Sequence, residues 1–118
     1  MDTITFGLFH DQKSAENAIN ELSHNGFLSK DISIIMKNQK IGKEVCKSTG
    51  AHLAGELLEG LIEFGFSEEK ALIYEKYIKA GSILIGITTI DTASTVKQIL
   101  QRYQAIEIRS LKKNTVKR

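Results

Sequence analysis

The chain of 118 residues contains no proline, no tryptophan and a single cysteine, Cys46. One cysteine excludes a disulfide within the chain and a zinc site built from cysteines. No run of 18 apolar residues is present, so we expect no membrane association. No signal-like segment precedes the first strand-like run, and we therefore expect a protein of the reducing cytoplasm.

A strong charge of one sign is also lacking. The net charge is +2, and four of the 16 basic residues lie in the last seven positions. Residues 1–111 therefore include 12 basic and 14 acidic side chains. Such a slightly acidic body is not suited to binding a polyanion. We predict a single α+β domain over residues 1–111, a flexible basic tail over residues 112–118 and no specific nucleic-acid partner.

The first third of the chain has the pattern of a strand, a helix and a second strand. Residues 3–9 alternate in the manner of a strand, and Asp11 is placed to cap the helix that follows. That helix has apolar residues at the spacing of one face: Ala15, Ala18, Ile19 and Leu22. Gly26 suits the left-handed position that ends a helix, and residues 32–36 read as the second strand.

The last third repeats this order. Residues 82–90 read as a strand, Asp91 is placed as a cap, and residues 106–109 form a short closing strand. Between them lies the same apolar spacing: Val96, Ile99, Leu100 and Tyr103. The chain thus contains two units of strand, helix and strand.

The middle of the chain has a different pattern. Residues 37–50 are polar and rich in lysine, and we interpret them as a loop. A helix is predicted from Ala51 to Phe64, and Ser67 is placed to cap another that ends at Gly81. The whole predicts an α+β fold in which ferredoxin-like split βαβ halves share one four-stranded sheet, with a two-helix insertion between them. The alternative is a parallel flavodoxin-like sheet, which the absence of a glycine-rich turn disfavours.

Residues 65–85, GFSEEKALIYEKYIKAGSILI, resemble the heat-induced stress-protein domain of small bacterial general-stress proteins. The opening TFGLFHDQKSAENAINEL and the segment DISII are similar to the start of the same family. Family members often carry a long apolar Gly/Ala segment before this motif, which is shortened here to GAHLAGELLEGLIEFG. The resemblance implies a stress-associated bacterial protein, and it supplies no catalytic residues.

Three groups of residues are candidates for chemistry. His10 and Asp11 end the first strand, where α/β proteins often bind ligands, although a helix cap explains Asp11 equally. Cys46 lies among lysines, which lower a thiol pKa, and is either redox-active or incidental. The third group shares one face of the predicted insertion helix: His52, Glu56, Glu59 and Glu63. We interpret that face as solvated, because no matching motif occurs on another helix, and we expect neither a metal nor a cofactor.

The sheet itself suggests an interaction face. We expect Ile4, Phe6 and Leu8 to share the helix-covered face with Ile83, Ile85 and Ile87. The opposite face would then carry two strand glycines and three large apolar side chains: Gly7, Phe9, Leu84, Gly86 and Ile90. Such a face needs a cover, either the helix of residues 51–65 or a second subunit.

These features favour a non-enzymatic stress-associated protein that acts through protein contacts, in the form of a homodimer. The alternative is a regulatory module that binds a small molecule, since doubled βαβ folds often serve that purpose. An enzyme ranks third, because no nucleophile-and-base motif or phosphate-binding glycine motif is present.

Overall fold

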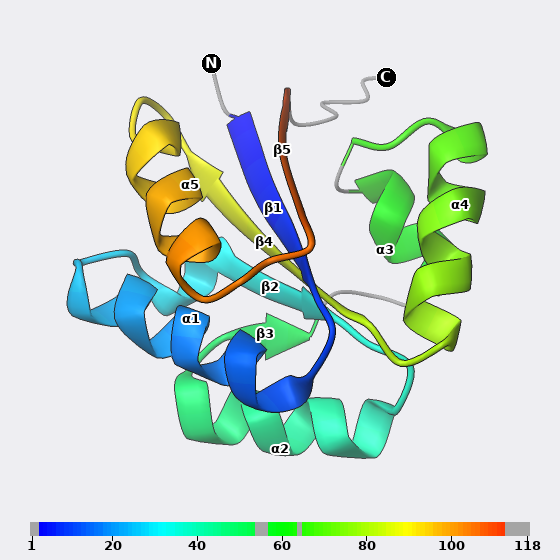
Figure 1. Ribbon diagram of the computed structural model, residues 1–118, viewed down its shortest axis with the longest axis horizontal. Coiled ribbons are helices and arrows are strands. Elements are labelled where there is room, and N and C mark those ends of the chain that lie inside the picture. Colours follow the sequence, from blue (N-terminus) through cyan, green and yellow to red (C-terminus); the bar gives the residue numbers. More distant parts are fainter. Residues whose placement is uncertain (1–2, 54–56, 64, 113–118) are drawn as a thin grey trace.

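A computed structural model describes residues 3–53, 57–63 and 65–112, and it contains five strands and five α-helices within those ranges (Figure 1). In chain order the elements are β1 (Thr3–Phe9), α1 (Gln12–His24), the 3-10 turn η1 (Ser29–Asp31), β2 (Ile32–Ile35), α2 (Gln39–Thr49), β3 (His52–Leu53), α3 (Leu57–Glu63), α4 (Glu68–Lys79), β4 (Ile83–Thr89), α5 (Ala93–Arg102) and β5 (Glu107–Lys112). Lys112 is the last residue of β5, and the rest of the predicted tail, 113–118, lies outside the described residues. No helix of the described ranges has both the length and the apolar character needed to span a bilayer.

The sheet has the strand order β3-β2-β4-β1-β5. Strands β1 and β4 are central antiparallel neighbours, as predicted, and β2 and β5 pair antiparallel to β4 and β1. The α+β class is therefore confirmed. The expected number of four strands is wrong, because His52 and Leu53 add a short parallel strand beside β2, where they pair with Ser33 and Ile34.

The insertion between β2 and β4 differs most from the prediction. Residues 37–50 are not a loop but contain α2, whose first turn is capped by the Asn38 side chain, which accepts a hydrogen bond of 3.0 Å from the Ile41 amide. Gly50, at a φ of 85°, ends α2 in the left-handed conformation that glycine adopts without strain. The start of the helix predicted from Ala51 is also wrong, because β3 occupies residues 52–53, whereas α3 (Leu57–Glu63) lies within the predicted range.

Helix α4 follows the prediction closely. The Ser67 side chain accepts a hydrogen bond from the Lys70 amide at the first turn. Ala71, Tyr74 and Ile78 are buried, as the predicted stripe requires. A turn with Gly81 at a φ of 116° then leads into β4.

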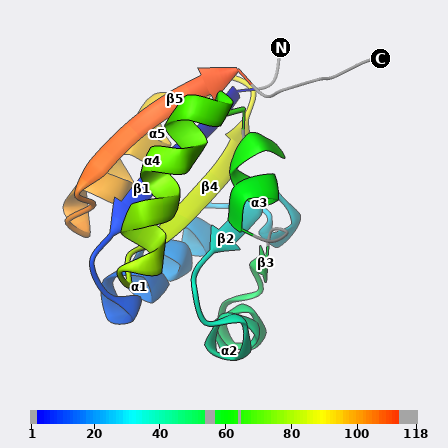
Figure 2. The ribbon, with the colours of Figure 1, turned by 90° about the vertical axis from the view of Figure 1, so that its right-hand side faces the viewer.

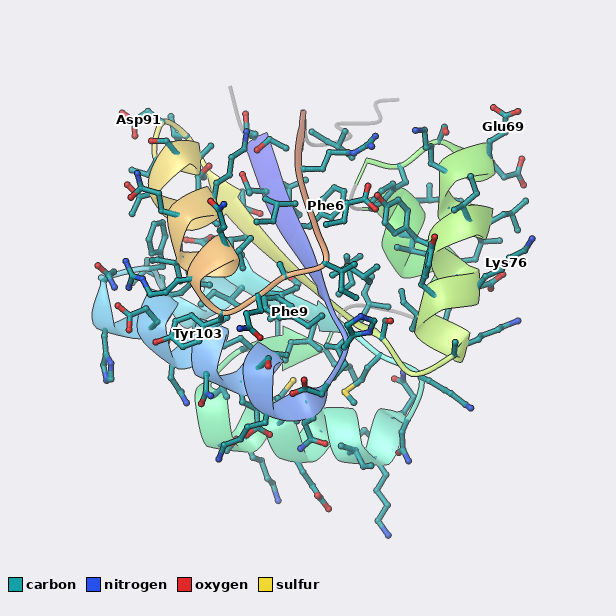
Figure 3. The ribbon with its side chains drawn as sticks, viewed as in Figure 1. Phe6, Phe9, Glu69, Lys76, Asp91 and Tyr103 are labelled. Atoms are coloured by element: carbon teal, nitrogen blue, oxygen red, sulfur yellow. The ribbon has the colours of Figure 1, made fainter. Side chains whose placement is uncertain are left out.

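Helices cover both faces of the sheet, with α1 and α5 on one side and α3 and α4 on the other (Figures 1 and 2). The first core packs α1, α2 and α5 on strand residues that include Phe9, Ile83 and Ile85. The second core packs α3 and α4 on Phe6 and Leu84, among others. Phe6 and Phe9 accordingly point to opposite sides of β1 (Figure 3).

The predicted interaction face is wrong in its composition. Leu8 lies opposite Leu84 and Phe6 opposite Gly86, so residues 4, 6 and 8 share a face with residues 84, 86 and 88. Gly7 and Phe9 instead lie on the α5 side with Ile83, Ile85 and Ile87, because a shift of one residue in register exchanges the faces of a strand. Ile90 lies beyond the end of β4 and is exposed. The expected cover exists and comes from the chain itself, from α3 within the predicted helix and also from α4.

Candidate functional site

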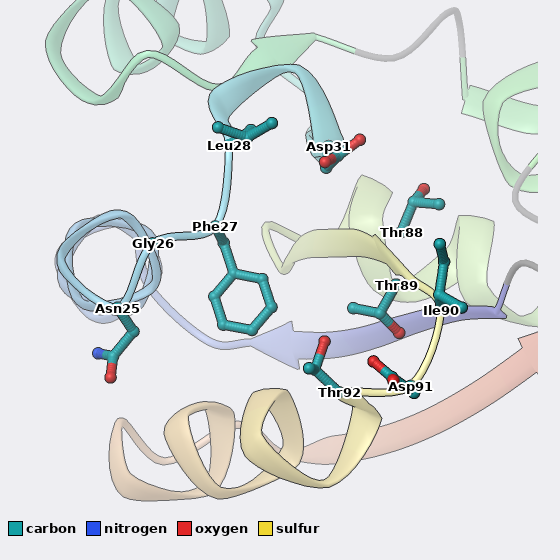
Figure 4. A pocket seen from close by; sticks show the side chains of 10 residues that line it. All are labelled: Asn25, Gly26, Phe27, Leu28, Asp31, Thr88, Thr89, Ile90, Asp91 and Thr92. Atoms are coloured by element: carbon teal, nitrogen blue, oxygen red, sulfur yellow. The ribbon is translucent and has the colours of Figure 1, made fainter.

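A hollow of about 500 Å³ opens at the end of β4 (Figure 4). Two chain segments form its walls: residues 25–31, which run from the end of α1 through η1, and residues 88–92, which lead from β4 into α5. Ten residues line it: Asn25, Gly26, Phe27, Leu28, Asp31, Thr88, Thr89, Ile90, Asp91 and Thr92. Its size falls in the range of about 300–1,000 Å³ that is usual for small-molecule sites.

The first wall follows from the way α1 ends. Gly26 has a φ of 91°, as the sequence predicts for this position. The Phe27 amide then donates a hydrogen bond of 3.1 Å to the Leu22 carbonyl, which closes the last turn of the helix. Phe27 packs partly into the first core, while Leu28 remains mostly exposed at the rim of the hollow. Residue Asp31, in η1, adds a carboxylate to this wall.

The second wall is the turn between β4 and α5. The prediction that Asp91 caps α5 is wrong, because Thr92 occupies the N-cap position and its side chain makes no capping hydrogen bond. The amides of the first turn of α5 thus lack the side-chain partner that most helices provide. Ile90, next to Asp91, exposes 73% of its surface at the rim.

Thr89 is the most unusual residue of the hollow. It is only 6% exposed, and its hydroxyl oxygen is buried without a hydrogen-bond partner among the described residues. Figure 4 shows this hydroxyl on the side of the hollow where Asp91 and Thr92 lie. A buried hydroxyl without a partner costs free energy, so such a group calls for an explanation, and a site for a ligand is one.

The chemistry of the walls favours a positively charged group. Asp31 and Asp91 contribute carboxylates from opposite walls, and Thr89 and Thr92 contribute hydroxyls, whereas the Thr88 hydroxyl points away from them (Figure 4). Carboxylates and hydroxyls accept hydrogen bonds from an ammonium group, whereas the two carboxylates repel an anion from the uncapped helix. The apolar side chains at the rim, Leu28 and Ile90, suit an apolar substituent.

His10 and Asp11 do not belong to this hollow. The antiparallel register places Phe9 opposite Ile83, whereas Thr3 lies opposite Thr89, so the end of β1 and the hollow are at opposite ends of the sheet. The Asp11 carboxylate caps α1, since it accepts hydrogen bonds from the amide and hydroxyl of Ser14 at 2.8 and 3.2 Å. His10 is exposed beside it.

The carboxylates and histidine of the insertion do not share a helix. His52 lies on β3, where its Nε2 atom is 3.1 Å from both the Ser33 hydroxyl and the Lys30 carbonyl. Glu59 lies on α3, and Glu56 is outside the described residues. Within residues 3–53, 57–63 and 65–112, no group of three His, Cys, Asp or Glu side chains is placed to hold a metal ion.

Cys46 lies on α2 and packs partly against the first core. Burial raises the pKa of its thiol, so less of the reactive thiolate is present at neutral pH than in a free cysteine. This environment favours the interpretation of an incidental thiol over that of a redox centre.

The residues of the hollow were not identified from the sequence. The signal available was the run TTIDT at residues 88–92, which concentrates hydroxyls and a carboxylate at the end of a strand. Comparison with models of known protein families finds no match, and no curated protein matches the chain. The assignment of the site therefore depends on its own geometry.

Proposed function

We propose that this protein is a non-enzymatic module that binds a small molecule with an ammonium group and an apolar substituent. The observation that carries the proposal is at Thr89, which lines a hollow with two carboxylates and whose hydroxyl is buried without a partner in the described chain. The ten lining residues include no histidine, cysteine or lysine, which favours recognition over catalysis.

The topology gives general support to this function. Without the short β3, the order β2-β4-β1-β5 is that of a ferredoxin-like split βαβ sheet. This layout often serves as a regulatory ligand-binding module, which is an argument from fold analogy. The resemblance of residues 65–85 to the heat-induced stress-protein domain adds the proposal that the module acts in a bacterial stress response in the cytoplasm.

Protein-observed NMR with simple amines tests the ligand class. Phenethylamine and isoamylamine are titrated into the ¹⁵N-labelled protein, alongside phenylacetate and isovalerate as matched anions. We expect the amines, and not the anions, to shift the amide signals of residues 25–31 and 88–92. Asp91→Asn should weaken the response to the amines at least several-fold, because it removes one of the two carboxylates.

Asp11→Asn is the matched control, since it removes a carboxylate at the opposite end of the sheet while asparagine still caps a helix well. It should leave the titration unchanged. Shifts that cluster around His10 and Asp11 would move the site to the end of β1. Equal shifts from amines and anions, or none at the hollow, would refute the proposed ligand class.

A further inference from the structure

Strand β5 is an open edge of the sheet. It pairs with β1 through residues 107–112, and no strand of the described chain lies on its other side (Figure 2). A six-residue edge strand presents a row of backbone donors and acceptors that can pair with another strand. The opposite edge is formed by β3, which has only two residues and therefore offers far fewer backbone groups for pairing.

The charged residues of this edge have both signs and lie on one face. Glu107 and Arg109 are two residues apart on the side of α4, and their side chains form an ion pair of 3.3 Å. The Tyr74 hydroxyl donates a hydrogen bond to the same Glu107 carboxylate and holds it in place. Ile108, between them in sequence, points to the other side and packs partly against the first core.

A second copy of the chain can extend the sheet across this edge about a two-fold axis perpendicular to the sheet. In such a dimer, residues that face each other across the axis lie on the same side of the sheet. The axis must therefore pass beside a residue and not between two residues. Near the middle of β5 this residue is Ile108, Arg109 or Ser110. A centre at Arg109 places two guanidinium groups opposite each other. A centre at Ser110 places Arg109 opposite Leu111 of the partner subunit and pairs no charges.

Only the register centred on Ile108 makes the edge complementary to itself. Glu107 then lies opposite Arg109 of the partner subunit, and Arg109 lies opposite the partner subunit's Glu107. Opposite charges at facing positions of antiparallel strands stabilise the pair, and like charges destabilise it. Together with the ion pair already present in each chain, these contacts form a network of four charges.

We propose that the protein forms a homodimer in which residues 107–109 of two β5 strands pair antiparallel about Ile108, so that the two five-stranded sheets join at this edge. This interface is separate from the hollow and does not depend on its ligand. It also differs from the sheet-face dimer that the sequence suggests, because α3 and α4 already cover that face.

Charge reversal at the edge tests both the dimer and its register. The wild-type protein should have the mass of a dimer by light scattering and analytical ultracentrifugation. Arg109→Glu gives an edge with two acids, and Glu107→Arg gives one with two bases. Each variant alone should dissociate with a dissociation constant raised about tenfold or more, because two attractive pairs become repulsive.

An equimolar mixture of the two variants is the decisive sample. In the Ile108 register, every acid of one variant faces a base of the other, so the mixture should form a heterodimer even though each variant alone dissociates. If the charge reversals acted only through repulsion between neighbouring side chains of the same chain, mixing the two variants would not restore association. Lys97→Glu, an exposed charge reversal on α5, is the matched control and should remain dimeric.

Circular dichroism establishes that each variant is folded, and Arg109→Gln provides a milder change that should raise the dissociation constant less than Arg109→Glu. A monomeric wild type at high concentration would overturn the proposal. So would a dimer that both reversals leave intact, or a mixture that fails to associate.

Discussion

The Tyr74 hydroxyl donates a hydrogen bond of 2.5 Å to the Glu107 carboxylate, which joins helix α4 to the edge strand β5. Tyr74 is only 3% exposed, and its ring packs against Phe66 and edge-on against Phe6 in the second core. The bond connects the insertion, which covers one face of the sheet, to the last strand of the described residues. We expect these two parts to stabilise each other.

The stability of the protein should therefore fall in alkali through Tyr74. Burial, and then the hydrogen bond to Glu107, raise the pKa of Tyr74 above its ordinary value of 10.0. A group whose folded pKa is raised contributes stability below its unfolded pKa, and this contribution is lost as the pH rises above about 10. Tyr74→Phe should lower the free energy of unfolding by about 1 kcal/mol at pH 7. It should also make the decrease of this free energy between pH 7 and alkaline pH smaller than in the wild type.

Urea unfolding from pH 7 to pH 11 measures both effects. Tyr77→Phe is the control, because Tyr77 is half exposed on the same helix. If Tyr74→Phe and Tyr77→Phe lost stability equally as the pH rose, Tyr74 would not be the source of the alkaline sensitivity.

The local pattern was sufficient to predict the two βαβ units and helix α4. Their apolar spacing and caps, such as Ser67 and Gly26, act within a few residues of each other, so the sequence shows them directly. Helix α2 was missed because its lysines suggested a loop, although Asn38 and Gly50 mark its two ends. Strand β3 was missed because two residues become a strand only by pairing with β2.

The faces of the sheet and the hollow depend on contacts between distant residues. The pairing of Leu8 with Leu84 decides which side chains of β1 and β4 share a face, and alternation along each strand does not reveal it. The hollow likewise joins residues 25–31 to residues 88–92. Each segment alone is typical of a turn, and only the topology brings their carboxylates and hydroxyls together.

Gly7 should be intolerant of a larger side chain, because helix α5 packs closely on it. A Cβ atom at this position would lie 3.1 Å from Leu100 Cδ1 and 3.3 Å from the Ala105 Cβ atom. Gly7→Val should lower the free energy of unfolding by about 1–3 kcal/mol, the usual cost of overpacking a core. Chemical denaturation of the single variant measures this loss.

The Gly7→Val and Leu100→Ala double variant provides the control for the mechanism. Leu100→Ala alone removes a buried side chain, but it also makes room above Gly7. The double variant should therefore be more stable than the sum of the two single losses predicts, by at least about 0.5 kcal/mol. Strict additivity would contradict the steric explanation.

Glu21 should make the contact between α1 and α5 sensitive to acid. Its carboxylate accepts hydrogen bonds from the Asn25 side chain at 3.0 Å and the Tyr103 hydroxyl at 3.1 Å, and lies 3.3 Å from the Arg102 guanidinium. The Asn25 bond, then the Tyr103 bond, lower the pKa of Glu21 below its ordinary value of 4.5. A lowered folded pKa gives stability above pH 4.5 that is lost as the pH falls below it.

Glu21→Gln should thus be less stable than the wild type at pH 7, and the difference should shrink at pH 3. Guanidinium unfolding midpoints at the two pH values measure this change. Glu44→Gln, an exposed glutamate on α2, is the control and should show no comparable pH dependence relative to the wild type. A constant difference for Glu21→Gln across the range would rule out its titration as the cause.

Two buried threonines should respond to the same substitution with opposite signs. Thr5 is fully buried and its hydroxyl shares a hydrogen bond of 2.8 Å with Ser110, whereas the Thr89 hydroxyl has no partner in the described chain. Thr5→Val removes a satisfied bond and should lower the free energy of unfolding by about 1 kcal/mol. Thr89→Val keeps the shape of the side chain and removes an unpaired polar group, so it should raise that free energy by about 1 kcal/mol.

The gain in stability at Thr89 should coincide with a loss of binding. Thr89→Val should weaken the NMR response to phenethylamine, because valine cannot hydrogen-bond to the amine, while Thr5→Val should retain it. Residues that lower the stability of the free protein but support ligand recognition occur often at binding sites, because their cost is recovered when the ligand binds. Thermal unfolding and amine titration of the two variants test both halves of this relationship. If Thr89→Val destabilised the protein as Thr5→Val does, the hydroxyl would already be satisfied, and the hollow would lose the observation that marks it as a site.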